Sequence, residues 1–127
     1  MADRLTMAMS ETLRRAAVIT AVLVVTAAAT FWMWPRPALT VRVERGGRAL
    51  VVDRWGRTAV LPETLLIAAQ GRSTRVLIDN RDTTYQTLGI FGVAANSTRS
   101  FTVPMPGVYG GYCSAHESGG RITYVIQ

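Results

Sequence analysis

The stretch PGVYGGYCSAHESGGRITYVI (106–126) decides how the rest of the chain is interpreted. It contains two runs, GVYGGY (107–112) and RITYVI (121–126), in which apolar or aromatic residues alternate with small or polar ones, a pattern typical of β-strands. The loop between them holds Cys113 and His116, the only cysteine and the only histidine in the sequence. Two strands and the sole thiol and imidazole therefore lie in one short segment.

Upstream of this stretch, short apolar alternations are separated by turn residues. These predicted strands are LTVRVE (39–44), RALVVD (48–53), RTAVL (57–61), TLLIAA (64–69), TRVLID (74–79), YQTLGIF (85–91) and TRSFTV (98–103). Closely spaced short strands, with no helical periodicity after Pro37, are typical of a sandwich or barrel. The sequence therefore predicts an all-β domain.

The residues that follow Leu61 resemble those of the cupredoxins, the small blue-copper domains. The resemblance is carried by Pro62, Ile67, Gly71, Val76, Asn80, Asp82, Pro106, Gly107, Tyr109, Tyr112, Cys113 and His116. It covers Leu61–Gln127, with the strands of residues 39–61 as the opening half. It implies a cupredoxin-like Greek-key β-sandwich.

A type 1 copper site requires two imidazoles and a thiolate, usually with a weak axial thioether. By the resemblance, Cys113 and His116 match the ligand loop, whereas the first ligand belongs about six residues after Asn80, where the chain has Gln86. No second histidine exists, and the nearest methionine, Met105, precedes the loop. A carboxamide is a poor substitute for an imidazole toward copper, so the copper site is expected to be degenerate.

Two interpretations of the site remain open. In the first, no metal or other cofactor is bound: Cys113 is a small buried apolar residue, and His116 donates to a carbonyl or to Gln86. In the second, copper is held by Cys113, His116 and Gln86, or the cysteine and histidine handle Cu(I) or Zn²⁺ transiently. The first is favoured, because both an imidazole and the axial methionine are absent.

Other residues of the domain are assigned structural roles. Tyr109 and Tyr112 are expected to pack the sandwich or form a corner hydroxyl bond, and Gly110 and Gly111 to allow bends or close backbone approach. Asp79 and Asp82 flank Asn80 and are expected to form turns rather than an acid and base pair. With one histidine, no GxSxG motif and no supporting acidic pair, catalytic residues are not expected and the protein is not expected to be an enzyme.

The N-terminal part carries a separate signal. Nineteen uncharged residues, Ala16–Trp34, follow Arg14 and Arg15, and this length approaches the ~30 Å of a bilayer core. Trp32 and Trp34 lie where an interfacial aromatic belt is expected, and prolines follow. The predicted division is a cytoplasmic segment (1–15), a transmembrane helix (16–34) and a periplasmic domain (35–127).

The orientation follows from the positive-inside rule, which places Arg14 and Arg15 in the cytoplasm and the remainder outside the inner (cell) membrane. The alternative is a cleaved signal peptide, because Ala27–Ala29 offer small residues behind a shorter apolar run. The apolar stretch continues beyond that point to Trp34, which favours an anchor. Ser10 is the predicted N-cap of the helix.

All fourteen basic residues are arginine, and residues 35–127 carry eleven of them against six acidic residues. They are scattered singly without aromatic interleaving, which disfavours a nucleic-acid groove and leaves a solvated face or a face near lipid headgroups. No disulfide can form within a chain that has one cysteine.

The favoured function is a non-catalytic accessory or scaffold subunit of a membrane electron-transport complex, of the photosynthetic reaction centre–light-harvesting or oxidase type. Its partners are then the membrane and other integral subunits, an assignment that rests on fold-level analogy. The alternative is a membrane-tethered copper electron carrier or copper-handling protein that uses Cys113 and His116. The apolar run GIFGVAAN (89–96) is the predicted contact surface, or else a loop folded into the core.

Overall fold

The computed structural model describes residues 2–115 and 120–127 and divides the chain into two units, Met1–Pro35 and Arg36–Gln127. The first unit is the single helix α1 (Ala2–Met33). The prediction that Ser10 caps this helix is wrong, because helix already begins at Ala2. Most residues before Ser10 are methionine, alanine, leucine or arginine, which all have high helix propensity, and no proline or glycine interrupts them, so the helix can start earlier.

Helix α1 is long and apolar enough to cross a membrane over Ser10–Met33, a span of 24 residues. Within it, the hydroxyl groups of Thr20 and Thr26 donate to the carbonyls four residues earlier, at 2.9 Å and 2.8 Å. These threonines therefore expose no unsatisfied donor, as a lipid environment demands. The helix ends just before Pro35, as predicted. Its orientation, and the division between residues 1–15 and 16–34, remain predictions.

The second unit is built from ten strands. They are β1 (Leu39–Glu44), β2 (Arg48–Val52), β3 (Thr58–Val60), β4 (Thr64–Ile67), β5 (Thr74–Asn80), β6 (Gln86–Leu88), β7 (Phe91–Val93), β8 (Ser97–Val103), β9 (Gly107–Tyr112) and β10 (Arg121–Ile126). The predicted all-β domain behind one N-terminal helix is confirmed.

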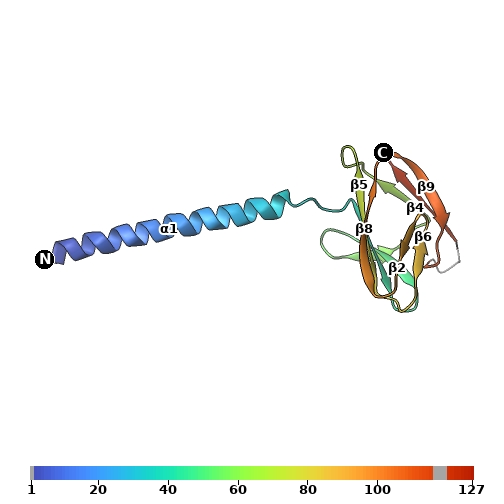
Figure 1. Cartoon of the computed structure of the whole chain (residues 1–127), viewed down its shortest axis with the longest axis horizontal. Helices are drawn as coiled ribbons and strands as arrows, with labels where there is room; N and C mark the ends of the chain where they lie inside the picture. The colour runs from blue at the N-terminus through green and yellow to red at the C-terminus, as the bar shows by residue number, and fades with distance from the viewer. Residues whose placement is uncertain (1, 116–119) are drawn as a thin grey trace. The chain divides into compact units, whose positions relative to one another are not determined.

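The strands form two main sheets, in the orders β3-β2-β1-β5-β8 and β4-β10-β9, with β6 and β7 as a separate hairpin. Figure 1 shows β5 and β8 on one side of the sandwich and β4 and β9 on the other. Two neighbouring pairs are parallel, β1 with β5 and β4 with β10. Parallel neighbours need crossover connections, so the chain passes from one sheet to the other, as a Greek-key sandwich requires.

The core lies between the two sheets. Alternation places Val41, Val76 and Ile78 on the inner face of the larger sheet, all fully buried, opposite Ile122 and Tyr124 of β10. Phe91 of the β6–β7 hairpin closes one side: its ring centroid lies 4.8 Å from that of Phe101 and 5.2 Å from that of Tyr124. The inward residues thus make one continuous apolar cluster.

Residues 85–91, predicted as one strand, instead belong to two strands, β6 and β7. The chain reverses between β6 and β7 at Gly89 and Ile90, where Gly89 has φ +68°, a value that a two-residue hairpin with glycine first requires. This hairpin also corrects the predicted contact surface at residues 89–96. Phe91 and Val93 are 4 % and 0 % exposed, so the run is mainly core, and Ile90 is its exposed large residue.

Candidate functional site

Strand β6 lies beside the segment that carries Cys113. Leu88 and Cys113 form an antiparallel bridge, the amide of Ser114 donates to the Thr87 carbonyl at 2.8 Å, and the Thr87 amide donates to Ser114 Oγ at 2.9 Å. The pairing brings Gln86 next to Ser114. The fold therefore assembles two of the sequence-predicted site residues, Gln86 and Cys113, in one region, while His116 lies outside the described residues.

The carboxamide of Gln86 is buried, at 5 % exposure, and both of its ends are bonded. Its nitrogen donates to Asp82 Oδ2 at 2.7 Å and to Thr84 Oγ1 at 3.1 Å, while its oxygen accepts from Ser114 Oγ at 2.6 Å. The nitrogen must face Asp82, because the amide oxygen would there oppose a carboxylate. To ligate a metal through its oxygen, Gln86 would have to give up the bond from Ser114.

Asp82 is the centre of this network. Besides Gln86, its carboxylate accepts from the Thr83 amide at 2.8 Å, from Thr84 Oγ1 at 3.0 Å and from the Gly46 amide at 3.4 Å. The Thr83 amide is the main cause that lowers the pKa of Asp82 below its ordinary value, and the bonds from Thr84, Gly46 and Gln86 act in the same direction against the effect of burial. Asp82 thus joins the β1–β2 turn to the strand that carries Gln86.

Because its pKa is lowered, the Asp82 carboxylate contributes to the stability of the fold in a pH-dependent way. Because the folded-state pKa of Asp82 lies below its ordinary value of 3.8, its contribution is present above that pH and is lost as the pH falls through the folded value. We expect Asp82→Asn to lower the urea midpoint at pH 7, since both carboxylate oxygens accept hydrogen bonds and an amide nitrogen in either place would face a donor. The gap between the two proteins should narrow in acid below pH 3.8. A gap that stays constant from pH 7 to acid would contradict this role.

Cys113 lies fully buried within the core cluster. Its amide donates to the Gly120 carbonyl at 3.0 Å. Tyr124 lies close by, with its hydroxyl donating to the Leu88 carbonyl at 3.0 Å, and burial together with the neighbouring Cys113 raises the pKa of this phenol. Tyr124 therefore stays neutral near neutral pH.

The described residues thus fit a type 1 copper ion poorly. Cys113 supplies a thiol, but the position where the resemblance implies an imidazole holds a carboxamide already bonded to Asp82 and Ser114. Within residues 2–115 and 120–127, no group of three His, Cys, Asp or Glu side chains is placed to hold a metal. At Gln86 the geometry favours a hydrogen-bonded network over a ligand set.

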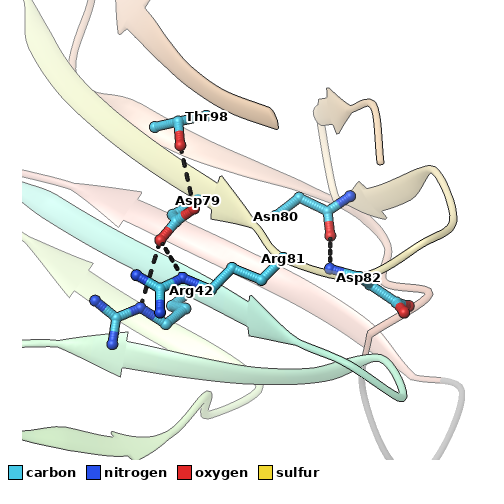
Figure 2. A network of polar contacts seen from close by, with 6 residues as sticks. All are labelled: Arg42, Asp79, Asn80, Arg81, Asp82 and Thr98. Carbon is cyan, nitrogen blue, oxygen red and sulfur yellow. Dashed lines mark hydrogen bonds and ion pairs between the residues drawn. The ribbon is translucent and has the colours of Figure 1, made fainter. Parts of the chain in front are cut away.

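A second polar cluster lies on the outer face of the larger sheet (Figure 2). Asp79 accepts from Arg81 Nε at 2.8 Å and from Thr98 Oγ1 at 3.1 Å, and Arg42 Nε lies 3.5 Å from the same carboxylate. Partial burial acts to raise the pKa of Asp79, but the bonds from Arg81 and Thr98 and the charge of Arg42 outweigh it and lower the pKa. Asp79 and Asp82 are therefore both ionised near neutral pH and do not form an acid and base pair.

The two tyrosines of β9 differ. The Tyr109 hydroxyl donates to the Met105 carbonyl at 2.7 Å, which confirms the predicted corner bond. Tyr112 is 60 % exposed, so the prediction that it packs the sandwich is wrong; it lies on the outer face of the smaller sheet. A Cβ on Gly111 would lie 3.0 Å from the backbone of Gly89, which confirms close backbone approach as the reason for that glycine.

Comparison with known proteins adds a likeness of fold. No protein-family model matches the chain, and no curated protein matches it. Among solved structures, it matches a novel purple cupredoxin from Nitrosopumilus maritimus, with 19 % identity over 69 % of this chain and 98 % of that one, at a TM-score of 0.42. The outer domain is a β-sandwich by its own strand order. The likeness assigns no ligand, cofactor or activity to this chain.

Sequence reasoning missed the polar residues that enclose Gln86. Asp82 was assigned only to a turn, and Ser114 was not singled out, although it holds the Gln86 oxygen. The segment NRDTTYQ (80–86) did carry a signal, because seven successive polar or aromatic residues between apolar strands are unusual for a plain turn. Their partners depend on contacts across the fold, which sequence spacing does not reveal.

Proposed function

We propose that this protein is a non-catalytic accessory or scaffold subunit of a membrane electron-transport complex, in which a cupredoxin-like domain has lost its copper site. The observation that carries the proposal is the hydrogen bonding of Gln86. Its carboxamide is buried, and both of its ends are bonded within the protein, to Asp82, Thr84 and Ser114. Such a network rigidifies the position that a copper ligand would occupy. The choice of a photosynthetic or an oxidase assembly rests on fold-level analogy.

A scaffold role needs a surface for a neighbouring subunit, and the outer face of the smaller sheet offers one. Leu66 of β4, Val125 of β10 and Val108 of β9 are adjacent in the strand register, and Leu66 and Val108 are each 72 % exposed. Tyr112 extends the same face beside Arg121. Apolar and aromatic side chains on a flat face, with a single charge among the residues named, are typical of the core of a protein interface.

The proposal is tested by purifying the full chain in detergent without chelator and measuring copper content and visible absorption. We expect substoichiometric copper and no thiolate-to-copper absorption. Copper near one ion per chain with such absorption would overturn the proposal and support the alternative, a membrane-tethered copper protein that uses Cys113 and His116.

The subunit role is tested in the same preparation by the proteins that co-purify. Val108→Glu is expected to abolish co-purification of an integral membrane complex, because it places a charge at the exposed β9 end of the apolar row. Val60→Glu is the matched control, since Val60 is 56 % exposed on an edge strand of the other sheet. Equal loss in both variants, or retention in both, would reject the proposed interface.

A further inference from the structure

The sandwich has one end at which the chain enters from α1, here called the linker end. Strand pairing defines it: Leu39 lies beside Val76, Thr74 beside Val103, and Ile126 beside both Ile67 and Gly107. It consists of residues 36–38, the loops 53–57, 68–73 and 104–106, the adjoining Arg75 and Gln127. In Figure 1 the C-terminus marks this end of the sandwich.

Charge is unevenly divided between this end and the rest of the domain. The linker end carries five arginines, Arg36, Arg54, Arg57, Arg72 and Arg75, all exposed, and a single described acid, Asp53. The other described acids of the domain, Glu44, Glu63, Asp79 and Asp82, lie at or toward the opposite end. An arrangement that looked scattered in the sequence is therefore a basic cluster in the fold.

The one acid at this end is used within its own turn. Asp53 accepts from the amides of Trp55 and Arg57 at 2.8 Å and 2.9 Å and from Arg57 Nε at 2.7 Å. Burial acts to raise the pKa of Asp53, but the bond from the Arg57 side chain and the two amide bonds outweigh it and lower the pKa. The Asp53 carboxylate thus stabilises the turn and neutralises the charge of Arg57. The charges of Arg54 and Arg72 can therefore interact with an external anion.

Two loop tips at this end expose large side chains. Trp55, at the tip of the turn that Asp53 holds, is 70 % exposed, and the Arg54 guanidinium lies 4.9 Å from the centre of its ring. Met105, between two prolines, is 66 % exposed. An indole beside arginine is the combination that partitions to the boundary between headgroups and acyl chains. Such tips suit a soft lipid surface better than a flat protein face.

The tether is short. Three residues along from Met33, the last helical residue, the Arg36 carbonyl accepts a hydrogen bond from Gln70 Nε2 of the domain at 2.9 Å. Three extended residues reach about 11 Å. If α1 spans a bilayer as far as Met33, Arg36 therefore lies within roughly one Debye length of the surface that the helix leaves.

We propose that the linker end docks on an anionic phospholipid headgroup surface, with Arg54 and Arg72 facing the phosphates and Trp55 and Met105 entering the interface. The inference goes beyond the scaffold function and does not depend on the state of the copper site; it rests on α1 spanning the bilayer. A tether of this length raises the effective concentration of lipid at this end, so weak contacts suffice.

The test uses the full chain with Trp32→Phe and Trp34→Phe, so that Trp55 is the only tryptophan, in nanodiscs of phosphatidylcholine with or without phosphatidylglycerol. We expect blue-shifted Trp55 emission and quenching by headgroup-level nitroxide lipids in the anionic nanodiscs, reversed at high salt because the Debye length shrinks. A spin label at Met105→Cys gives an independent depth measurement, since Cys113 is buried and escapes labelling.

The matched variants are R54Q/R72Q at the linker end and R45Q/R48Q at the opposite end, which remove the same charge. At about 1 kcal/mol for each arginine near an anionic surface, the first pair should lower the ratio of docked to undocked protein about thirtyfold, and the second should leave it unchanged. Equal effects of the two pairs would overturn the proposal. The proposal would also be overturned if Trp55 and the spin label at position 105 both remained exposed to water in anionic nanodiscs. Shielding of these probes that appears only with a co-purified acidic protein would overturn it as well.

Discussion

Replacing Asn80 by alanine is expected to destabilise the protein by about 2–6 kcal/mol, because two buried partners, the Val93 carbonyl and the Asp82 amide, each lose a bond at a cost of about 1–3 kcal/mol. The Asn80 side chain is 1 % exposed, and its nitrogen donates to the carbonyls of Thr84, Val93 and Ala94 at 3.0–3.1 Å. Its oxygen accepts from the Asp82 amide at 3.0 Å (Figure 2). One side chain thus ties the end of β5 to the segment after β7.

The measurement is urea unfolding of the full chain in detergent, followed by the near-ultraviolet signal of the domain rather than the helix. Thr98→Ala is the control, because Thr98 is exposed and its hydroxyl makes one described bond, to Asp79. It should cost about 1 kcal/mol or less. If Asn80→Ala costs no more than this control, the three carbonyls find other partners and the tying role of Asn80 is wrong.

Replacing Gln86 by histidine is expected to convert a chain without stoichiometric copper into one that binds about one ion, because imidazole is a far better copper ligand than a carboxamide. The change removes the bonds to Asp82 and Ser114 that hold the native side chain. It also places a second imidazole where the cupredoxin resemblance implies a ligand. Copper titration followed by thiolate-to-copper absorption measures the gain.

The double variant Gln86→His/Cys113→Ser is the matched control, since it keeps the new imidazole and removes the thiolate. It should lose the absorption and most of the affinity. A folded Gln86→His protein that binds no copper would show that residue 86 and Cys113 do not converge on one ion. The interpretation that residue 86 occupies a ligand position of a degenerate copper site would then be wrong.

Much of the fold follows from sequence, because the alternation of apolar residues maps directly onto the buried face. The two-residue period predicts correctly that Val41 and Val43 of β1 and Val76 and Ile78 of β5 are all buried. The prediction of a single strand over residues 85–91 was wrong, because the chain turns at Gly89. Only the positive φ of Gly89 in the structure shows this turn. The early helix start was also missed, because a serine was given more weight than the propensity around it.

The candidate site was less predictable for a different reason. The identity of Gln86, Cys113 and His116 could be obtained from the sequence, but the environment of Gln86 depends on Ser114, 28 residues away. Short-range spacing therefore identified which side chains to examine and not what they contact. The basic linker end was hidden in the same way, since its arginines come from three separate segments.

The position of β10 also governs how the protein acquires its structure. This strand lies in the middle of the smaller sheet, with residue 64 of β4 beside residue 123 and residue 112 of β9 beside residue 121. Strand β4 therefore has no sheet partner until the far end of the chain has arrived, and such long-range parallel pairing is slow. During that delay the chain exposes the unpaired apolar edge of TLLI (64–67), and chaperone binding or aggregation competes with the pairing of β4 and β10.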